Sequence, residues 1–337
     1  LKQGNPLTVL TKLVKQYNVE AIYWSRCYEP AYIKRDEIIK AELKSMGVKV
    51  ISRNSSLLNE PWEILNQSGQ YFKVFTPYWR KCLQKIHVKP LHTISNWPSS
   101  QPVPSDVLEQ WELLPKNPNW AKEFSAHWEP GENGALNNLN LFISNHLKGY
   151  RELRNQPAKE GTSKLSPHLH FGEISPNQVW LSVQQAMQEP GCDLTSAQTY
   201  LSELGWREFS YQLLYHYPKL MELNFNRKFD SFSWEHDEAS LMCWQKGMTG
   251  YPIVDAGMRE LWRTGYMHNR VRMIVASFLT KDLLIDWREG ERWFWDTLVD
   301  ADLANNSANW QWVAGCGADA APYFRIFNPV SQGQKFD

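Results

Sequence analysis

The N-terminal part of the chain alternates between helical periodicity and short apolar runs. Residues 6–17 place apolar side chains on one helical face: Leu7, Leu10, Leu13, Val14 and Tyr17. Residues 19–24 and 48–53 are apolar runs of the strand type, and a second helix, about residues 31–46, lies between them and ends before Gly47. This alternation predicts an α/β domain with a parallel sheet.

Only two strands are predicted in this region, and the sequence opens on a helix with no strand before it. Two strands are too few for a doubly wound parallel sheet, which is buried on both faces. We therefore expect residues 1–86 to form a partial α/β domain that lacks its first strands.

Prolines among polar residues mark the end of this region. They predict an extended interdomain linker over residues 87–119, and they are Pro90, Pro98, Pro102, Pro104, Pro115 and Pro118. Helical patterns dominate residues 120–337, which we expect to form a second domain. Ser166 and Ser175 each precede a proline, so each is predicted to cap a helix start with its hydroxyl.

Residues 264–312 combine a buried helical pattern with unusually placed polar residues. The apolar positions predict a long amphipathic helix that starts near His268, and they are Val271, Ile274, Val275, Phe278 and Leu279. Asn269, Arg272 and Met273 share one face of this helix. A second polar cluster follows and consists of Asp300, Asp302, Asn305 and Asn306. Such a concentration of polar groups between aromatic runs indicates a lined pocket rather than a solvated surface.

Each of these polar residues also has a purely structural interpretation. Asp302 and Asn305 belong to the residue types that cap helices or close turns. Arg272 and Asp300 could form an ordinary buried ion pair. The residues alone leave both interpretations open.

Composition narrows the class of protein. The 36 basic and 36 acidic residues balance, so any contact with nucleic acid must come from a local patch. The 5 cysteines form no CxxC pair and leave an odd count, which predicts reduced thiols in the cytoplasm rather than disulfides or a metal site. No apolar run approaches the roughly 18 residues that a membrane span needs. The 17 tryptophans are more than packing usually requires.

Two further groups of residues are placed to bind a ligand. Residues 161–166, Gly-Thr-Ser-Lys-Leu-Ser, put backbone N–H groups and hydroxyls ahead of a helix, which suits a diphosphate or simply caps that helix. The second group shares one helical face and consists of Glu203, Trp206, Arg207 and Ser210. Charged residues are rare on a core helix, so the floor of a cavity explains this face better.

These segments, in this order, resemble the cryptochrome/photolyase family, most closely the class I-like bacterial cyclobutane-pyrimidine-dimer DNA photolyases. The resemblance covers most of the C-terminal two-thirds, namely residues 160–176 (EGTSKLSPHLHFGEISP), 203–209 (ELGWREF), 246–261, 264–312 and 321–337. The N-terminal part matches more weakly. Members of this family begin with strands that are absent here and continue beyond residue 337, so we expect a fragment of a longer protein.

The resemblance implies an all-α C-terminal domain that binds FAD noncovalently in a folded-back form. The implied FAD contacts are Tyr150, Thr162, Ser163, Lys164, Leu165, Ser166, Tyr200, Asn269, Arg272, Asp300, Ala301, Asp302 and Asn306. In this family the position of Asn306 faces the flavin N5 atom, where an amide is able to donate a hydrogen bond. Trp310, Trp287 and Trp234 fall on the family's electron-transfer chain from flavin to surface, although their spacing alone predicts only core aromatics.

The family's substrate is a pyrimidine dimer in DNA, which the resemblance brings to a second set of residues. Those implied to act on the dimer are Glu203, Trp206, Asn269, Met273 and Trp312. Those implied to bind DNA are Arg154, Glu203, Trp206, Arg207, Ser210, Asn269 and Arg270. We expect a monomeric lyase without membrane contact that uses blue light and reduced FAD to repair these dimers.

A cryptochrome-type photoreceptor is the alternative function, because it uses the same flavin. Trp206, Glu203 and Asn306 favour repair, since receptors often lose the dimer-binding tryptophan or replace the amide. A second, antenna chromophore stays open between a folate, a flavin type and none. Glu29 matches an acidic position near the folate of some photolyases, but Leu220 and Met221 stand where a Cys-Lys pair helps to hold it.

Overall fold

The computed structural model describes residues 1–88, 95–96, 102–322 and 324–336. Contacts between residues divide it into two compact units. The first comprises Leu1–Ser55 and the described part of residues 89–120, and the second comprises Ser56–Val88 and the described residues from Ala121 onward. Pro90 and Pro98 of the predicted linker lie outside the described residues.

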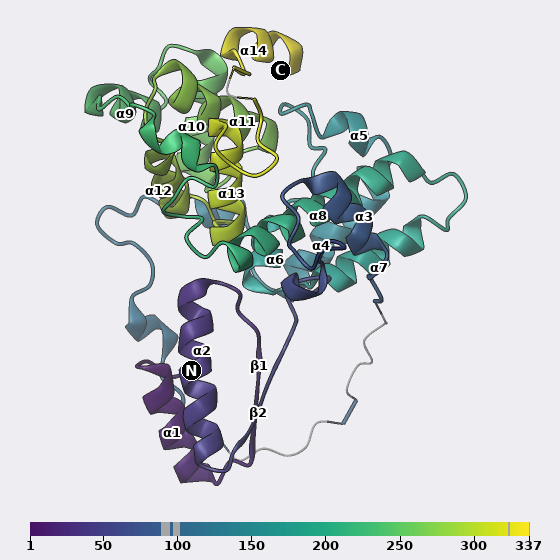
Figure 1. The fold of residues 1–337 in the computed structure, drawn as a ribbon, viewed down its shortest axis with the longest axis vertical. Helices are drawn as coiled ribbons and strands as arrows, with labels where there is room; N and C mark the ends of the chain where they lie inside the picture. Colours follow the sequence, from purple (N-terminus) through teal and green to yellow (C-terminus); the bar gives the residue numbers. More distant parts are fainter. Residues whose placement is uncertain (89–94, 97–101, 323, 337) are drawn as a thin grey trace. The chain divides into compact units, whose positions relative to one another are not determined.

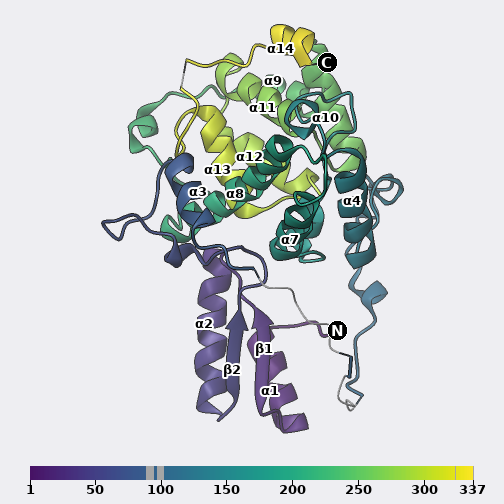
Figure 2. The same ribbon diagram turned by 90° about the vertical axis from the view of Figure 1, so that its right-hand side faces the viewer.

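The first unit is a small α/β layer made of α1 (Pro6–Tyr17), β1 (Ala21–Ser25), α2 (Pro30–Ser45) and β2 (Lys49–Arg53), with η2 (Leu108–Trp111) from the linker region. The two strands are parallel, with Ala21 opposite Lys49, and both helices follow them lengthwise (Figure 2). Val14 of α1 packs with Ile39 and Leu43 of α2, and Ile22 and Val50 of the strands pack against this cluster. The predicted helices and strands of this region are confirmed.

The second unit is all-α, as the family resemblance implies (Figure 1). Its elements before the long central helix are η1 (Pro61–Glu63), α3 (Phe75–Leu83), η3 (Phe124–Ala126), α4 (Glu132–Asn145), α5 (Tyr150–Leu153), α6 (Ser166–Phe171) and α7 (Pro176–Ala186). The central helix is α8 (Leu194–His216). The elements after it are η4 (Arg227–Ser231), α9 (Glu238–Gln245), α10 (Pro252–Thr264), α11 (Asn269–Ser277), η5 (Phe278–Asp282), α12 (Trp287–Thr297), α13 (Leu303–Ala314) and α14 (Pro329–Phe336).

Residues 56–86 belong with the helical unit in this structure, whereas the sequence grouped them with the α/β domain. The reason is tertiary packing, because both η1 and α3 contact the distant helix α8. The compact units therefore divide the chain after Ser55 as well as near the predicted boundaries at residues 86 and 119. As a statement about domain organisation these boundaries stay a prediction.

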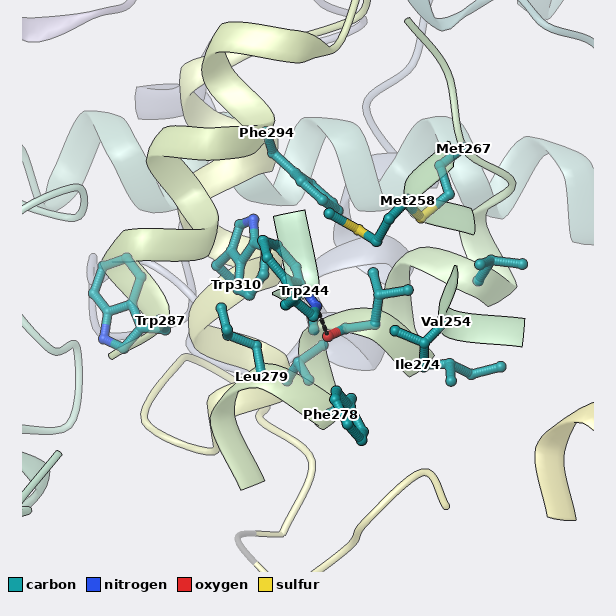
Figure 3. Packing of buried hydrophobic residues seen from close by; sticks show 14 of the residues in the cluster. Trp244, Val254, Met258, Met267, Ile274, Phe278, Leu279, Trp287, Phe294 and Trp310 are labelled. Atoms are coloured by element: carbon teal, nitrogen blue, oxygen red, sulfur yellow. Dashed lines mark hydrogen bonds between the residues drawn. The ribbon is translucent and has the colours of Figure 1, made fainter. Parts of the chain in front are cut away.

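Among the described residues, two of the hydrophobic clusters that build the helical unit lie around the candidate site. One lies among α10, α11, α12 and α13 and contains Trp244, Trp287 and Trp310 (Figure 3). The other lies among α4, α6, α7 and α8. Helix α13 contacts α8, α11 and α12, so it links the two cores and brings the polar residues of three helices together.

Helix starts follow the sequence in most places. Helix α11 starts after His268, as predicted, and the His268 side chain caps it, but α11 is short and continues as the π-helical turn η5 rather than as one long helix. Ser175 caps α7 in a capping box with Gln178, which confirms that prediction. The predicted cap by Ser166 is wrong, because its hydroxyl donates instead to Asp300, 134 residues away, at 2.6 Å.

All five cysteines are free thiols: Cys27, Cys82, Cys192, Cys243 and Cys316. In the described ranges, every helix is too short or too polar to cross a lipid bilayer.

Candidate functional site

A cavity of about 510 Å³ opens among α5, α6, α8, α11 and α13 of the helical unit. Its size is within the range of small-molecule sites. Most residues that the sequence singled out line it, namely Tyr150, Arg154, Thr162, Ser163, Lys164, Leu165, Ser166, Tyr200, Glu203, Trp206, Arg207, Asn269, Arg270, Arg272, Met273, Asp300, Ala301, Asp302, Asn305, Asn306, Trp310 and Trp312. Ser210, Trp287 and Trp234 are not among its lining residues.

Asp300 organises one wall of this cavity. Its Oδ2 atom accepts from Arg272 Nη2 at 2.9 Å and from the Ser166 hydroxyl at 2.6 Å. Burial opposes the charge of Arg272, but Asp300 beside it raises the pKa of the guanidinium. The buried ion pair left open by the sequence is therefore present. Asp300 Oδ1 is buried without a partner among the described residues, so an acceptor is left for a ligand that donates a hydrogen bond.

Asp302 is both a helix cap and a cavity residue. It accepts from the backbone N–H of Asn305 at 2.9 Å at the start of α13, which confirms the capping interpretation. Burial raises the pKa of this carboxyl, but a hydrogen bond from His170, the charge of Arg207 and a hydrogen bond from Tyr211 outweigh it and lower the pKa to about 2. Asp302 is consequently a stable anion at one end of the cavity.

The Thr-Ser-Lys loop runs along the cavity just ahead of α6. The Ser163 hydroxyl accepts from Tyr200 at 3.1 Å, which joins the loop to α8. Lys164 has a φ of +51°, an uncommon value for a residue with a side chain, and its ammonium lies 3.4 Å from Glu160. The loop thus presents hydroxyls and one exposed cation to the cavity.

Asn306 is buried on α13 and lines the cavity. Its Nδ2 atom donates to the carbonyl oxygen of Glu291 at 2.9 Å. An amide nitrogen carries two hydrogens, so this contact orients the side chain and leaves one N–H for a ligand.

The cavity face of α8 is charged, as the sequence indicated. Glu203 pairs with Arg154 Nη1 at 2.5 Å. Burial raises the pKa of the Glu203 carboxyl, while Arg154 opposes that change. A carboxylate and a guanidinium therefore form an ion pair in the wall of the cavity, which Trp206 also lines.

Two residues predicted to bind DNA are engaged inside the protein. Arg207 Nη1 donates to the carbonyl oxygen of Ser56 at 2.5 Å, and its side chain is only 11% exposed. Ser210 is buried, and its hydroxyl donates to the carbonyl oxygen of Trp206 at 3.1 Å. A phosphate could reach either side chain only by displacing these contacts, and the DNA-binding role of both residues stays a prediction.

Arg270 lies at the cavity with partners of its own. It donates to the side-chain oxygen of Asn155, and its Nη1 lies 3.9 Å from the sulfur of Met273. Burial lowers the pKa of this guanidinium, and the nearby charge of Arg154 adds to the effect. Arg270, Arg154 and the Glu203 carboxylate that pairs with Arg154 therefore leave one net positive charge at this part of the cavity, which favours an anionic ligand.

Two tryptophans of the predicted electron-transfer chain, Trp310 and Trp287, lie in one core (Figure 3). Trp310 lines the cavity and is 3% exposed, and its ring lies directly against the backbone of α12 at Gly290, where a Cβ atom would collide with it. Trp287 stands one turn before Gly290 on the same helix and is fully buried. Trp234 is half-buried and packs against the same cluster. This order is compatible with a route from cavity to surface.

Sequence reasoning missed part of the lining. The additional residues are Leu169, His170, Leu204, Tyr266, Ala276, Phe294, Leu298, Asn309 and Val313. Asn309 had a signal, because it follows Asn306 by one helical turn. Most of the others are apolar residues whose spacing suits a core as well as a cavity wall, so the sequence offered no way to separate them.

Two family models match the chain. One is described as the FAD binding domain of DNA photolyase and matches residues 200–337. The other is described as DNA photolyase and matches residues 1–99.

Individual relatives match over nearly the whole chain. A deoxyribodipyrimidine photo-lyase of Agrobacterium fabrum is 50% identical, and the alignment covers 100% of this chain and 70% of that protein. A solved bacterial class III photolyase from Agrobacterium tumefaciens is 50% identical with a TM-score of 0.91 and covers 99% of this chain and 69% of the solved one. A solved cryptochrome from Synechocystis is 31% identical, with a TM-score of 0.84 and coverages of 99% and 70%.

Proposed function

The chain belongs to the cryptochrome/photolyase family, and from this premise we propose how its own residues serve the family's repair reaction. It catalyses the light-dependent repair of cyclobutane pyrimidine dimers in DNA by electron transfer from reduced FAD. The FAD supplies the electron when it absorbs light, and the protein supplies binding, orientation and electrostatics. The class I-like placement within the family stays a prediction, because a solved relative at 50% identity is a class III photolyase.

The cavity suits FAD in its chemistry. The buried Oδ1 of Asp300, which has no hydrogen-bond partner among the described residues, is an acceptor for a ring N–H, and the remaining N–H of Asn306 is a donor. The backbone and hydroxyls of residues 162–166, with Lys164, are placed to hold the diphosphate. The remaining proposed FAD contacts are Tyr150, Tyr200, Asn269, Arg272, Ala301 and Asp302.

The observation that carries the proposal is that two kinds of residue line one cavity. Asp300, Arg272 and Asn306 are suited to the cofactor, while Trp206 and Trp312 present flat rings to the same space. An electron donor and an aromatic base bound there would be neighbours. We assign Trp206 and Trp312 to stacking on the dimer, and Glu203, Asn269 and Met273 to its polar and apolar edges.

A dimer inside a duplex must leave the helix to reach this cavity, and photolyases are among the enzymes that extrude their target in this way. Arg154 and Arg270 remain the proposed phosphate contacts, since both line the cavity and carry charge at its wall. Trp310, Trp287 and Trp234 are the proposed route for photoreduction of oxidised FAD. The monomeric state and any antenna chromophore stay predictions.

Photosensing is the competing function within this family. The presence of Trp206, Glu203 and Asn306 together supports repair, because a receptor needs neither a stacking tryptophan nor a carboxylate for the dimer. A relative named cryptochrome is 34% identical to this chain, against 50% for the Agrobacterium fabrum deoxyribodipyrimidine photo-lyase.

Reconstitution with FAD tests the assignment of the cavity. We expect flavin absorbance to elute with the protein on gel filtration. Thermal unfolding should shift upward as FAD concentration rises, because binding to the native state alone stabilises it. Protein that elutes without flavin and unfolds at an unchanged temperature would contradict the assignment.

A further inference from the structure

One face of Trp206 is covered by another aromatic ring. Phe75, the first residue of α3, stacks on it with ring centroids 3.8 Å apart and 9° between the planes. Trp206 lines the cavity, whereas Phe75 is not among the described residues that do, and it is 9% exposed. Since an indole has two faces and Phe75 occupies one, a ligand in the cavity would stack on the other.

Phe75 is itself held in a stack. Trp79, one turn further along α3, lies nearly parallel to it, at 6.4 Å and 12°. Trp79 in turn lies against α8 at Gly205, where an added Cβ atom would be only 2.6 Å from the Trp79 ring. Gly205 directly precedes Trp206, so the absence of a side chain there lets α3 approach α8 closely enough for the rings to meet.

A distant carboxylate fixes the start of α3. The backbone N–H of Phe75 donates to the Asp319 carboxylate at 3.0 Å, across 244 residues of sequence. Val74, which precedes the helix, provides no side-chain cap, so Asp319 takes over that role. Asp319 lies in the loop after α13, and α13 carries Trp312. The contact therefore ties the residue behind Trp206 to the helix that bears the second stacking ring.

From this stack we propose that Phe75 is a positioning residue for the substrate: it holds the plane of Trp206 so that the free face is ready to stack on the extruded dimer. The inference rests on the proposed contact between Trp206 and the dimer. A side chain that is ordered before binding loses less freedom on binding, so preorganisation of the indole appears as affinity. Phe75 acts through Trp206 and touches no substrate itself.

Binding in the dark to oligonucleotides with and without a thymine dimer provides the test. Phe75→Ala should weaken binding to dimer-containing DNA by about three- to tenfold, the range expected for loss of an aromatic pair. Affinity for undamaged duplex and FAD content should not change. Phe75→Tyr should keep the affinity because it keeps the ring, whereas Phe75→Leu should lose it because an aliphatic side chain refills the volume without a flat face.

Tyr78→Leu is the matched control for a loss of stability. Tyr78 is buried on the same helix and packs on Phe209 with centroids 5.2 Å apart, without a ring contact to Trp206. We expect Tyr78→Leu to lower the unfolding temperature and leave the affinity for dimer DNA intact. Equal affinity losses in Tyr78→Leu and Phe75→Ala, or full affinity in Phe75→Leu, would overturn the proposal.

A double-mutant cycle separates this inference from the proposed function. With Trp206 already replaced by Ala, Phe75→Ala should cost no further affinity, because the ring that it positions is gone. An undiminished loss in that background would show that Phe75 does not act through Trp206. If Trp206→Ala alone leaves affinity for dimer DNA unchanged, the proposed substrate contact itself fails, and the inference built on it falls with it.

Discussion

Asp300→Asn should separate the structural and the cofactor-binding roles of the cavity wall. The substitution keeps the shape of the side chain but replaces one carboxylate oxygen by an amide nitrogen, which only donates. Oδ2 accepts from Arg272 and Ser166, and Oδ1 is the free acceptor. The asparagine therefore loses a hydrogen bond either to the protein partners or to the ligand, depending on which position its nitrogen takes.

The magnitudes follow from burial and charge. The side chain of Asp300 is 4% exposed and that of Arg272 is 24% exposed. Breaking a fully buried pair costs 3–5 kcal/mol, so with Arg272 partly solvated we expect a loss of about 2–3 kcal/mol in the free energy of unfolding. A hydrogen bond to a charged group contributes about 1.5–3 kcal/mol, so FAD affinity should fall by about ten- to a hundredfold.

Titration of the apoprotein with FAD, beside thermal unfolding without FAD, measures the two effects separately. Asp255→Asn is the matched control, because Asp255 is a buried carboxylate that accepts from the backbone of Thr249 and Gly250 but does not line the cavity. The control should lose stability and keep FAD affinity. The double variant Asp300→Asn, Arg272→Gln should recover part of the stability, since no uncompensated charge remains, and none of the FAD affinity.

Two results would refute this reasoning. If Asp300→Asn binds FAD as tightly as the original protein, the free carboxylate oxygen does not contact the cofactor. If Asp255→Asn loses as much FAD affinity as Asp300→Asn, the loss reflects general destabilisation of the helical unit.

Three further predictions concern substrate, electron transfer and pH. Trp206→Ala should weaken binding to dimer DNA by about ten- to a hundredfold through lost stacking and leave binding to undamaged DNA nearly unchanged; an equal loss on both would make Trp206 a packing residue. Trp234→Phe should sharply slow photoreduction of oxidised FAD with external reductant, while chemically reduced protein still repairs dimers; unchanged photoreduction would exclude the proposed route. Burial raises the pKa of Glu208 to about 7, against the opposing charge of Arg207. The native state therefore holds this proton more tightly than the unfolded chain does. The free energy of unfolding should fall by about 3 kcal/mol as pH rises from 4.5 to 7, because the proton is lost over that range. Glu208→Gln keeps an acceptor for the backbone N–H groups of Leu58 and Asn59 and should stabilise the protein at pH 8 but not below pH 4.5, as urea unfolding at both values would show.

Local patterns predicted the elements of this fold well. The boundaries of α1 match the apolar spacing of residues 6–17, and the capping box of α7 follows from Ser175 and Gln178. Such features depend on neighbours in sequence. The hydrogen bond of Ser166 could not be predicted in the same way, because its hydroxyl donates to a carboxylate 134 residues away and does not cap the local backbone.

In the candidate site, too, features that depend on neighbours in sequence were predictable, and features that depend on distant contacts were not. Polar residues on one helical face, such as Asn269 and Arg272, predicted a cavity, because burying them in an apolar core would cost free energy. The support for Trp206 could not be predicted, since it depends on α3 meeting α8 at Gly205 and on a cap from Asp319. The hydrogen bond from Arg207 to the backbone carbonyl of Ser56 could not be predicted either, because it joins residues 151 positions apart.

Repair of an oligonucleotide that carries one thymine dimer is the decisive measurement. The protein reconstituted with FAD and chemically reduced should restore the ultraviolet absorbance of the two thymines under blue light, and neither the dark sample nor the protein without FAD should do so. A reduced, FAD-loaded protein that binds the damaged oligonucleotide but leaves the dimer intact under blue light would contradict repair and favour a photosensor.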